Sequence, residues 1–363
     1  MQIKAPKQEL IRCAQSVVNA TATKSTLPIL SNIHLEAHKS KLYWSGTDLE
    51  IAIQTEMDAE VGETGSITVP GRKFYDIIKE LSDGEIEITV RKNNTVEIEC
   101  GKAYFKIMGT PSDDFPKPPE LNTQEILTLP QEVLKEFFAI TSFAVSHDET
   151  RYVLNGVLMV VCGGEVKVVA TDGRRLSVVK RKGISPEALE KEVIIPAKTV
   201  HELNRNMGGG GNVVVHFGEN QIRFDFDRTK LYSRLIEGQF PNYEQVIPKH
   251  KGKEIKIRRE DFLSAVKRVS LLAGSSQPVR LELGKNRLTT SAQSGEVGEA
   301  REEVDAHYSG DAVVAGFNPG FLMDALKNIA LEEISLELED AEKPGVIRTG
   351  DDYLYVVMPM QLS

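Results

Sequence analysis

Three stretches of the sequence share one pattern: SITVPGRKFYDIIKEL at 66–81, EVIIPAKTVHELNRNM at 192–207 and AVVAGFNPGFLMDALKNI at 312–329. Each begins with a short apolar run, which predicts a β-strand, and continues through a proline or Asn-Pro into apolar residues at helical spacing. Proline is favoured at the first position of a helix because the amide hydrogen that it lacks would be unpaired there. Each stretch therefore predicts a strand followed at once by a helix.

The sequence around these stretches repeats as well. Amphipathic helices are predicted at 6–19, 130–146 and 258–273. A pair of strands with alternating apolar and charged residues follows each of the three stretches quoted above. Asp48 and Asp172 are 124 residues apart, and Phe115 and Phe240 are 125 residues apart. A regular period of this kind indicates an internally repeated architecture.

The repeats predict an α+β fold of three units, each with two helices packed on antiparallel sheet. The expected domains are residues 1–120, 125–247 and 253–363, and the candidate linkers are the Pro-rich 117–124 and the Lys-rich 247–254.

Composition is that of an ordinary globular protein, with 363 residues, 40% hydrophobic and 27% charged. The three cysteines, Cys13, Cys100 and Cys162, have neither a disulfide pattern nor metal-ligand spacing. The N-terminus lacks the apolar core of a secretory signal, and no apolar stretch approaches the roughly 18 residues of a membrane span. These features predict a cytoplasmic protein.

No catalytic motif stands out in the sequence. The seven histidines form no metal-binding motif, and the glycine run at 208–211 lacks the Lys-Ser/Thr of a phosphate-binding loop. Asp48 and Asp172 could form a carboxylate pair, but the third repeat has no acid there, and aspartate at strand ends is typical of turns. We therefore expect a protein that is not an enzyme, with no metal and no cofactor, and that works by binding partners.

Charge is distributed unevenly. The net charge is −9, which by itself argues against a nucleic-acid binder. The six predicted helices nevertheless carry a small positive excess, so the remaining residues are strongly acidic. If the helices share one face, that face would attract phosphates without reading base sequence. The alternatives at this point are a repeated scaffold that binds only proteins and an enzyme of unidentified chemistry.

End to end, the sequence resembles the beta subunits of bacterial DNA polymerase III, the replication sliding clamps. The residues that carry the resemblance are TLPILSNIHLE (26–36), GTDLEI (46–51), VPGRKFYDI (69–77), DDFP (113–116), SHDETRYVLNGVLM (146–159), ATDGRRLSVV (170–179), GQFPNY (238–243) and YVVMPMQLS (355–363).

The resemblance implies a DNA-clamp fold in which two chains join head to tail into a ring of six units. Such a ring encircles duplex DNA, independently of its sequence, and tethers the replicative polymerase, so that it confers processivity without catalysis. The implied partners are duplex DNA, a second copy of the chain, the polymerase III catalytic subunit, the clamp loader, other polymerases, and repair and ligase proteins that carry linear motifs.

Candidate DNA contacts come from the resemblance and from the helix charges: Lys24, Arg72, Lys73, Arg151, Tyr152, Lys198 and Arg205. Val153 stands where a second aromatic is found in the family, and Asp148 stands where a polar amide is found. Both departures are expected to weaken contact with DNA.

The resemblance also implies a groove for a short motif, roughly Gln-x-x-Leu-Phe, between the second and third units. Its expected residues are Leu154, Thr171, Gly173, Arg174, Arg175, Leu176, Pro241, Val246, Val346, Val356, Met358, Pro359, Met360 and Leu362. Arg175 is expected to act as a polar gate. Arg174, Gln245, Ser276 and Gln361 depart from the family pattern and are expected to alter the ranking of partners. The expected dimer interface is Phe105, Ile107, Ser270, Leu271 and Leu272.

Overall fold

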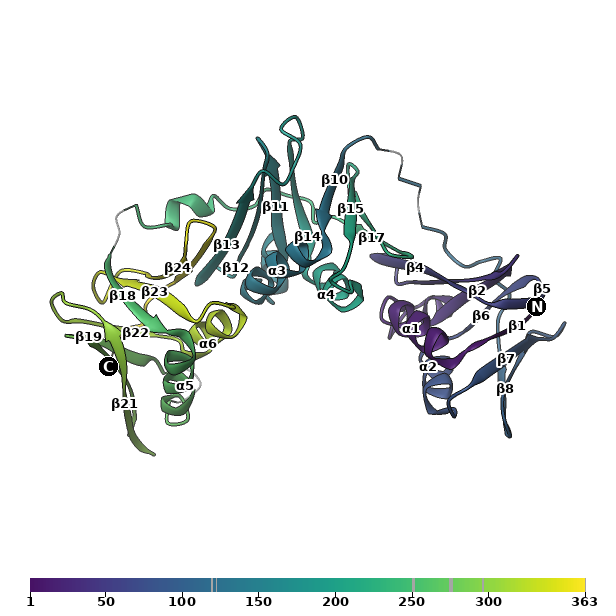
Figure 1. Ribbon diagram of the computed structural model, residues 1–363, viewed down its shortest axis with the longest axis horizontal. Coiled ribbons are helices and arrows are strands. Elements are labelled where there is room, and N and C mark those ends of the chain that lie inside the picture. The colour runs from purple at the N-terminus through teal and green to yellow at the C-terminus, as the bar shows by residue number, and fades with distance from the viewer. Residues whose placement is uncertain (119, 122, 250–251, 274–276, 296, 363) are drawn as a thin grey trace. The chain divides into compact units, whose positions relative to one another are not determined.

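The computed structural model describes residues 1–118, 120–121, 123–249, 252–273, 277–295 and 297–362. Short helices alternate with antiparallel strands, as the repeats predict (Figure 1). The α-helices in the described part are α1 (Lys7–Val18), α2 (Gly71–Glu80), α3 (Gln131–Thr141), α4 (Ala197–Asn206), α5 (Arg259–Val269) and α6 (Pro319–Asn328). The strand-to-helix pattern of the three decisive stretches is thereby confirmed.

Helix ends differ from the predicted bounds in two places. The helix predicted over 130–146 ends at Thr141 and is followed by the 3₁₀ turn η2 (Ser142–Ala144). The helix predicted over 258–273 ends at Val269, and Ser270 to Ala273 continue as turns. Helix α6 begins as predicted, because Pro319 occupies its first turn and the Asn318 side chain accepts a hydrogen bond from the Phe321 amide.

The chain forms two compact units. Unit 1 is Met1–Lys135 with Lys198–Leu235, and unit 2 is Glu136–Ala197 with Ile236–Ser363. The second repeat therefore contributes α4 to unit 1 and most of α3 to unit 2. Within the described residues, no helix is long and apolar enough to cross a membrane.

Unit 1 contains two antiparallel sheets, ordered β5-β1-β7-β8-β9 and β10-β15-β16-β17-β4-β3-β2-β6. Their strands are β1 (Gln2–Pro6), β2 (Asn32–His38), β3 (Lys41–Thr47), β4 (Ile51–Asp58), β5 (Glu60–Glu63), β6 (Gly65–Pro70), β7 (Glu85–Val90), β8 (Thr95–Cys100), β9 (Ala103–Met108), β10 (Ile126–Pro130), β15 (Asn212–Phe217), β16 (Gln221–Phe226) and β17 (Thr229–Arg234). Strands β4 and β17 pair across two repeats, and we name this pairing the first joint.

Helices α1 and α2 cover one face of the eight-stranded sheet. The fully buried Trp44 of β3 lies 6.0 Å from the ring of Phe74 on α2. Helix α1 approaches β3 so closely that a Cβ on Gly46 would lie 2.3 Å from the Val17 carbonyl oxygen. Because side chains alternate along a strand, Tyr43 and Ser45 face the opposite side, which we name the open face.

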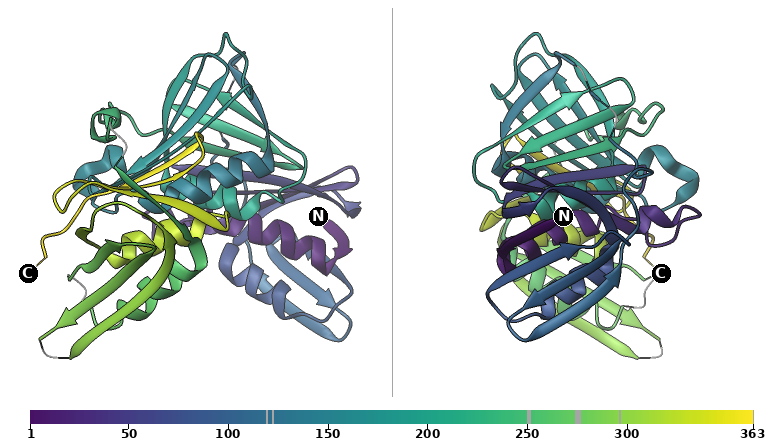
Figure 2. Two further views of the ribbon diagram at one scale, coloured as in Figure 1. Left: turned by 60° about the vertical axis from the view of Figure 1, so that its left-hand side comes forward. Right: turned by 90° about the vertical axis from the view of Figure 1, so that its right-hand side faces the viewer.

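Unit 2 is built on a sheet ordered β14-β11-β12-β13-β25-β24-β23-β18-β21-β20-β19-β22. Its strands are β11 (Gly156–Cys162), β12 (Glu165–Thr171), β13 (Arg175–Lys182), β14 (Lys191–Pro196), β18 (Lys253–Arg258), β19 (Val279–Gly284), β20 (Arg287–Ser294), β21 (Gly298–His307), β22 (Val313–Phe317), β23 (Glu333–Leu338), β24 (Gly345–Thr349) and β25 (Tyr353–Val357). Strands β13 and β25 pair across the second and third repeats, and we name this pairing the second joint. Figure 2 shows the yellow hairpin of β24 and β25 extending the teal strands.

The side chains of β13 alternate between the two faces of this sheet. Ser177 donates a hydrogen bond to the Ile140 carbonyl of α3, so odd-numbered positions face the helices. Leu176 and Val178 therefore lie on the open face of unit 2. Tyr355 of β25 is fully buried on the helix side, where it donates a hydrogen bond to the Phe321 carbonyl of α6.

Candidate functional site

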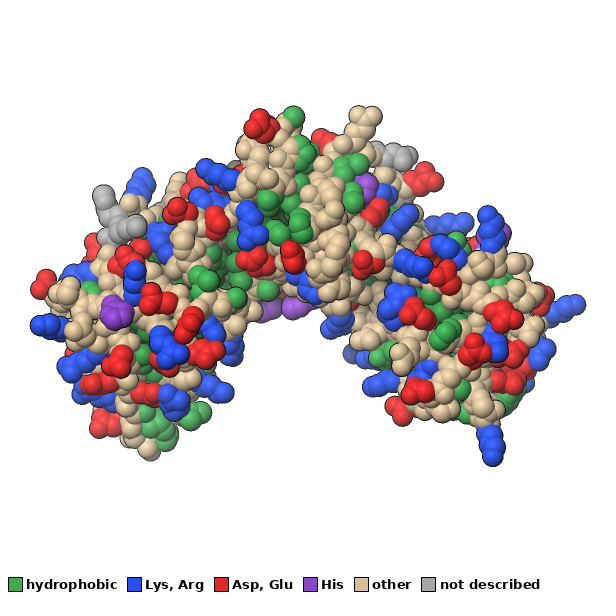
Figure 3. All heavy atoms as spheres, viewed as in Figure 1, with side chains coloured by type: hydrophobic (Ala, Val, Ile, Leu, Met, Phe, Trp, Pro, Cys, Tyr) green, Lys and Arg blue, Asp and Glu red, His purple; other side chains and the backbone are tan. Residues whose placement is uncertain are grey.

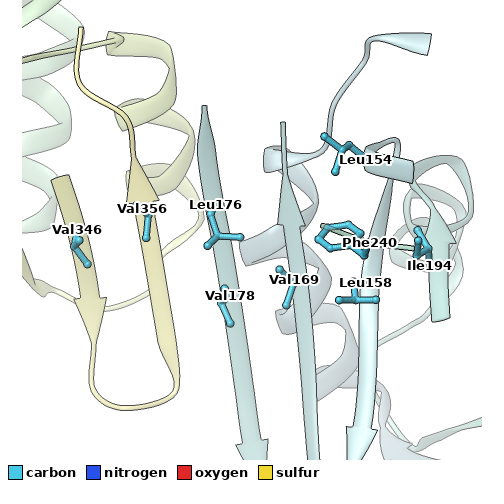
Figure 4. Close-up of a cluster of buried hydrophobic side chains, with 9 residues drawn as sticks. All are labelled: Leu154, Leu158, Val169, Leu176, Val178, Ile194, Phe240, Val346 and Val356. Carbon is cyan, nitrogen blue, oxygen red and sulfur yellow. The ribbon is translucent and has the colours of Figure 1, made fainter. Parts of the chain in front are cut away.

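An apolar cluster covers the open face of the second joint. Its buried members are Leu154, Leu158, Val169, Leu176, Val178, Ile194, Phe240, Val346 and Val356 (Figure 4). Leu176 and Val178 come from β13, whereas Val346 and Val356 come from β24 and β25. The register explains this meeting, because Leu176 is opposite Val356 and Val356 is opposite Val346. Residues from two repeats thereby form one continuous buried apolar cluster.

The tail segment Met358–Leu362 follows β25 and is attached at two points. The Met358 amide donates to the Arg174 carbonyl at 2.9 Å, and the Met360 amide donates to the Gly316 carbonyl at 2.8 Å. Glycine at 316 permits this approach, since a Cβ there would lie 2.7 Å from Leu362. Met358 is 42% exposed, so part of this flexible residue is available to a ligand.

A small hollow lies beside Val346. Its volume is about 350 Å³, and its lining includes Gln245, Val246, Ile247, Lys249 and Val346. Val246 is 50% exposed, which is unusual for an aliphatic side chain next to a buried cluster. The hollow shares Val346 with the cluster, and the tail segment continues from β25 of the same joint.

The turn between β12 and β13 is fixed by its own hydrogen bonds. Asp172 Oδ1 accepts from the amides of Arg174 and Arg175, at 2.8 and 3.0 Å. Thr171 Oγ1 donates to the Arg175 carbonyl and accepts from the Gly173 amide. Gly173 has a φ of +85°, a left-handed conformation that glycine adopts without steric cost. The expected groove residues Thr171, Gly173 and Arg174 therefore form a rigid rim.

Arg175 does not have the position expected of a polar gate. Its side chain is 8% exposed and lies on the helix side of β13, opposite to Leu176. The guanidinium group is fully engaged inside unit 2 with Asp172, Asp324 and the Phe143 carbonyl. The expectation of a gate is corrected: the strand's alternation takes this side chain to the far face of the sheet.

The other expected groove residues differ in their burial. Leu154 and Leu176 are buried within it, whereas Pro241 is exposed and Pro359 and Met360 are partly buried. Exposed Arg174, Gln245 and Gln361 supply polar groups at the edge. Ser276 lies outside the described residues. Sequence reasoning missed Phe240, although its recurrence at the Phe115 spacing was a signal for it.

A second hollow lies on the open face of the first joint, within unit 1. It has a volume of about 1090 Å³ and is lined mainly by polar residues, among them His34, Glu36, Ser45 and Gln54. The His34 ring stacks on Phe115 with 5.3 Å between centroids. Burial lowers the pKa of His34, so the imidazole is neutral at pH 7.

The seven candidate DNA contacts are all exposed. Within unit 1, Arg72 and Lys73 lie on α2, Lys198 and Arg205 lie on α4, and Lys24 lies between α1 and η1 (Pro28–Ser31). Lys198 is paired with Asp48, and Arg205 is paired with Glu202 at 3.3 Å. Lys24, Arg72 and Lys73 have no ion-pair partner in the part of the chain that the structure describes.

The two candidate DNA contacts of unit 2, Arg151 and Tyr152, lie on the 3₁₀ segment η3 (Glu149–Leu154). Tyr152 is 58% exposed, and Arg151 donates a hydrogen bond to the Asp172 carbonyl. Hydrogen bonds from Thr150 hold the pKa of Asp148 below its ordinary value, so Asp148 is ionised and would repel a phosphate. Figure 3 shows acidic and basic side chains interspersed on the visible face of each unit.

The expected dimer residues lie at two exposed edges, one in each unit. Phe105 and Ile107 are on β9, the edge strand of the five-stranded sheet, and Phe105 is 38% exposed. Ser270, Leu271 and Leu272 follow α5, and Leu271 is 80% exposed. An unpaired edge strand and an exposed leucine are features that a partner surface would cover.

Family models match almost the whole chain. They describe the N-terminal, central and C-terminal domains of the DNA polymerase III beta subunit, and they match residues 1–119, 128–242 and 244–361. The beta sliding clamp of Escherichia coli K12 is 34% identical, with 100% of both chains covered. That of Staphylococcus epidermidis is 33% identical over 97% of this chain and 96% of the relative.

Solved structures agree with the sequence matches. The DNA polymerase sliding clamp of Bacillus subtilis is 30% identical, with a TM-score of 0.94 and 100% of both chains covered. A Pseudomonas aeruginosa sliding clamp bound to griselimycin is 33% identical, with the same TM-score and coverage. The chain belongs to the family of bacterial DNA polymerase III beta subunits, the sliding clamps that encircle DNA and act as processivity factors for the polymerase.

Proposed function

We propose that partner proteins of this clamp bind through a short apolar motif at the second joint. The binding site, which we name the partner groove, consists of the apolar cluster, the tail segment Met358–Leu362 and the hollow beside Val346. The observation that carries the proposal is the exposure of the apolar side chains of Val246 and Met358 at the joint where Leu176, Val356 and Val346 from two repeats form a buried apolar cluster. Such a surface suits the aliphatic and aromatic anchors of a Gln-x-x-Leu-Phe motif.

The tail segment is the element whose removal tests this proposal. Truncation after Val357 removes one wall of the partner groove but leaves the β13–β25 pairing in place. Anchor contacts typically contribute at least about 2 kcal/mol, or about thirtyfold in affinity, and the truncation removes several. We expect a fluorescein-labelled Gln-x-x-Leu-Phe peptide to lose detectable binding in an anisotropy titration.

The dimer is the control for this truncation, because the expected interface residues lie elsewhere in the chain. Light scattering should give the same mass for the truncated and the full-length protein. Griselimycin, which is bound to the Pseudomonas clamp, supplies a second probe, and we expect it to compete with the peptide. Equal peptide affinity of the two proteins would refute the assignment of the groove.

The proposed DNA contacts are Lys24, Arg72, Lys73, Lys198 and Arg205 in unit 1, together with Arg151 and Tyr152 in unit 2. They are exposed, and most are cationic, so they can contact phosphates without reading the base sequence. Three of the cations already have an acidic partner, which favours weak contacts over tight binding.

Retention on DNA should therefore be topological. After loading onto a nicked circular duplex, the protein should stay bound through a moderate-salt wash and should be lost when a restriction enzyme cuts the circle. Gel filtration of the DNA with labelled protein measures this directly. Similar loss from circular and cut DNA would contradict the proposal.

We also propose a head-to-tail dimer in which the edge strand β9 of one chain, with Phe105 and Ile107, meets Ser270–Leu272 of another. Light scattering at micromolar concentration should give about twice the mass of one chain, and Leu271→Asp should give the single-chain mass. The domains proposed for each chain are residues 1–120, 125–247 and 253–363, and the proposed location is the cytoplasm, where replication takes place.

A further inference from the structure

We propose that Arg175 is a positioning residue of the partner groove, which it influences without touching the ligand. Its buried guanidinium group connects the β12–β13 turn to helix α6 and thereby sets the spacing between the two walls of the groove. This inference rests on the proposed function of the groove, and its test separates the two.

The guanidinium group makes three hydrogen bonds to three parts of unit 2. Nε donates to Asp172 Oδ2 at 3.0 Å, Nη1 donates to Asp324 Oδ2 at 2.7 Å, and Nη2 donates to the Phe143 carbonyl at 2.6 Å. The group also lies 4.4 Å from the centre of the Phe321 ring. Only arginine combines a planar fork of donors with stacking on an aromatic ring, so lysine cannot reproduce this set of contacts.

The contacts of α6 carry this constraint to the groove. Asp324 and Phe321 both belong to α6, and the Phe321 carbonyl accepts a hydrogen bond from Tyr355 of β25 at 2.9 Å. Tyr355 is next to Val356, whose side chain lies in the apolar cluster. On the other wall, Arg175 is next to Leu176 of the same cluster. The guanidinium group therefore links the residues behind both walls from the helix side of the sheet.

The first joint provides a comparison inside the same chain. Asp48 accepts hydrogen bonds from the amides of Glu50 and Ile51, as Asp172 does from those of Arg174 and Arg175, so Ile51 stands where Arg175 stands. The first joint therefore has a similar turn but no guanidinium group at this position.

The acidic partner of Arg175 also has a counterpart at the first joint. Asn206 donates to the Glu202 carbonyl and Asn328 donates to the Asp324 carbonyl, both at 2.8 Å, so Glu202 stands where Asp324 stands. Among the described residues, Glu202 forms an ion pair with Arg205 of its own helix, and one of its carboxylate oxygens is buried without a hydrogen-bond partner there. The arginine link is thus found at the joint with the apolar groove and not at the joint with the polar one.

The test compares Arg175→Met, Asp324→Asn and the double variant in full-length protein, with the labelled Gln-x-x-Leu-Phe peptide as probe. We expect Arg175→Met to weaken binding at least about tenfold and Asp324→Asn about threefold, with the double variant no weaker than Arg175→Met. Residues that act as one unit show such non-additive effects. Arg175→Lys, which keeps the charge without the fork, should recover only part of the affinity.

The controls separate positioning from general stability. Asp48→Asn weakens the ion pair with Lys198 at the first joint and should leave peptide affinity unchanged. Dimer mass and retention on circular DNA should be unchanged in Arg175→Met, whatever its melting temperature. Wild-type peptide affinity in Arg175→Met, or additive effects of the two substitutions, would overturn the proposal. If truncation after Val357 also left affinity unchanged, the groove assignment itself would be wrong.

Discussion

The open faces of the two joints have the same strand register and opposite chemistry. At the first joint, His34 is opposite Ser45 and Ser45 is opposite Gln54. At the second joint, the corresponding positions, each 124 residues later, are Leu158, Val169 and Val178, and they pair in the same order. Three polar side chains thus stand where three apolar ones form the floor of the partner groove.

The chemical difference extends to the residues that pair across each joint. Ala52 pairs with Tyr232 and Tyr232 with Arg223 at the first joint, whereas the corresponding residues at the second joint are Leu176, Val356 and Val346. Phe115 and Phe240 also correspond: Phe115 stacks on His34, and Phe240 packs within the apolar cluster.

The strand register that the two joints share therefore does not by itself produce an apolar site. Each joint has a hollow, but the second also has exposed apolar side chains, Val246 and Met358, whose removal from water drives association. At the first joint a ligand would have to replace the hydration of polar groups such as Gln54, Ser45 and Arg223, at a cost in free energy. A motif with leucine and phenylalanine anchors should therefore bind at one joint per chain.

The largest effect is expected when a residue of the second joint is replaced by its counterpart from the first. Val346→Arg places a charge, as Arg223 does, in the floor of the partner groove. Because Val346 is only 2% exposed, the arginine must displace neighbouring side chains to reach water, and we expect a loss of about a hundredfold in affinity, or about 2.8 kcal/mol, by fluorescence anisotropy. The reciprocal variant Arg223→Val, in unit 1, should bind the peptide as wild type does. An unchanged affinity in Val346→Arg would show that this floor is not used.

The tail segment has a backbone counterpart at the end of β17, where the Arg234 amide donates to the Glu50 carbonyl as the Met358 amide donates to the Arg174 carbonyl. A smaller change tests what the side chains of the tail contribute. Met360→Ala shortens one apolar side chain but keeps the backbone hydrogen bond to Gly316. We expect a loss of about tenfold in peptide affinity, or about 1.4 kcal/mol, because the other wall remains. Leu331→Ala, at an exposed leucine outside the groove, is the matched control. An equal loss in both variants would contradict a specific role for the tail.

The smallest expected effect concerns the buried acid at the first joint. Burial raises the pKa of Glu202 above its ordinary value of 4.5. At pH 7 the ionised carboxylate therefore destabilises the fold. Glu202→Gln should therefore increase the free energy of unfolding at pH 7 by about 1 kcal/mol, because a buried negative charge is removed.

The stability difference between Glu202→Gln and the wild-type protein should depend on pH. The folded state binds the proton of Glu202 more tightly than the unfolded state, so the cost of the carboxylate disappears as the pH falls below 4.5. Urea unfolding of both proteins should show the difference at pH 7 and little difference near pH 4. A stability advantage that was equal at both pH values would exclude ionisation of Glu202 as its cause.

Much of the fold followed from the sequence because the strand-to-helix stretches carry strong local signals. Pro70, Pro196 and Asn318-Pro319 mark the starts of α2, α4 and α6 in the sequence and in the structure. The groove residues followed from the family resemblance, which supplies positions but not side-chain directions. Arg175 was therefore expected in the groove, although its neighbour Leu176 could not share its face of a strand.

Other features depend on register between segments that are distant in the sequence. The partnership of Arg175 with Asp324 spans 149 positions and requires the β13–β25 pairing, which no local pattern reveals. Similarly, the buried position of Glu202 depends on how α4 packs within unit 1. Its sequence context, KTVHELNRN, resembles that of a solvent-exposed acid.

The continuous pairing at each joint has a consequence for how the clamp responds to dilution. Both joints are intramolecular, and a linker connects the repeats on either side, so a joint that opens remains at a high local concentration of its partner and closes again. The proposed contact between two chains has no such tether, and its lifetime depends on protein concentration. On dilution, we expect the contact between chains to open first, while β4 stays paired with β17 and β13 with β25.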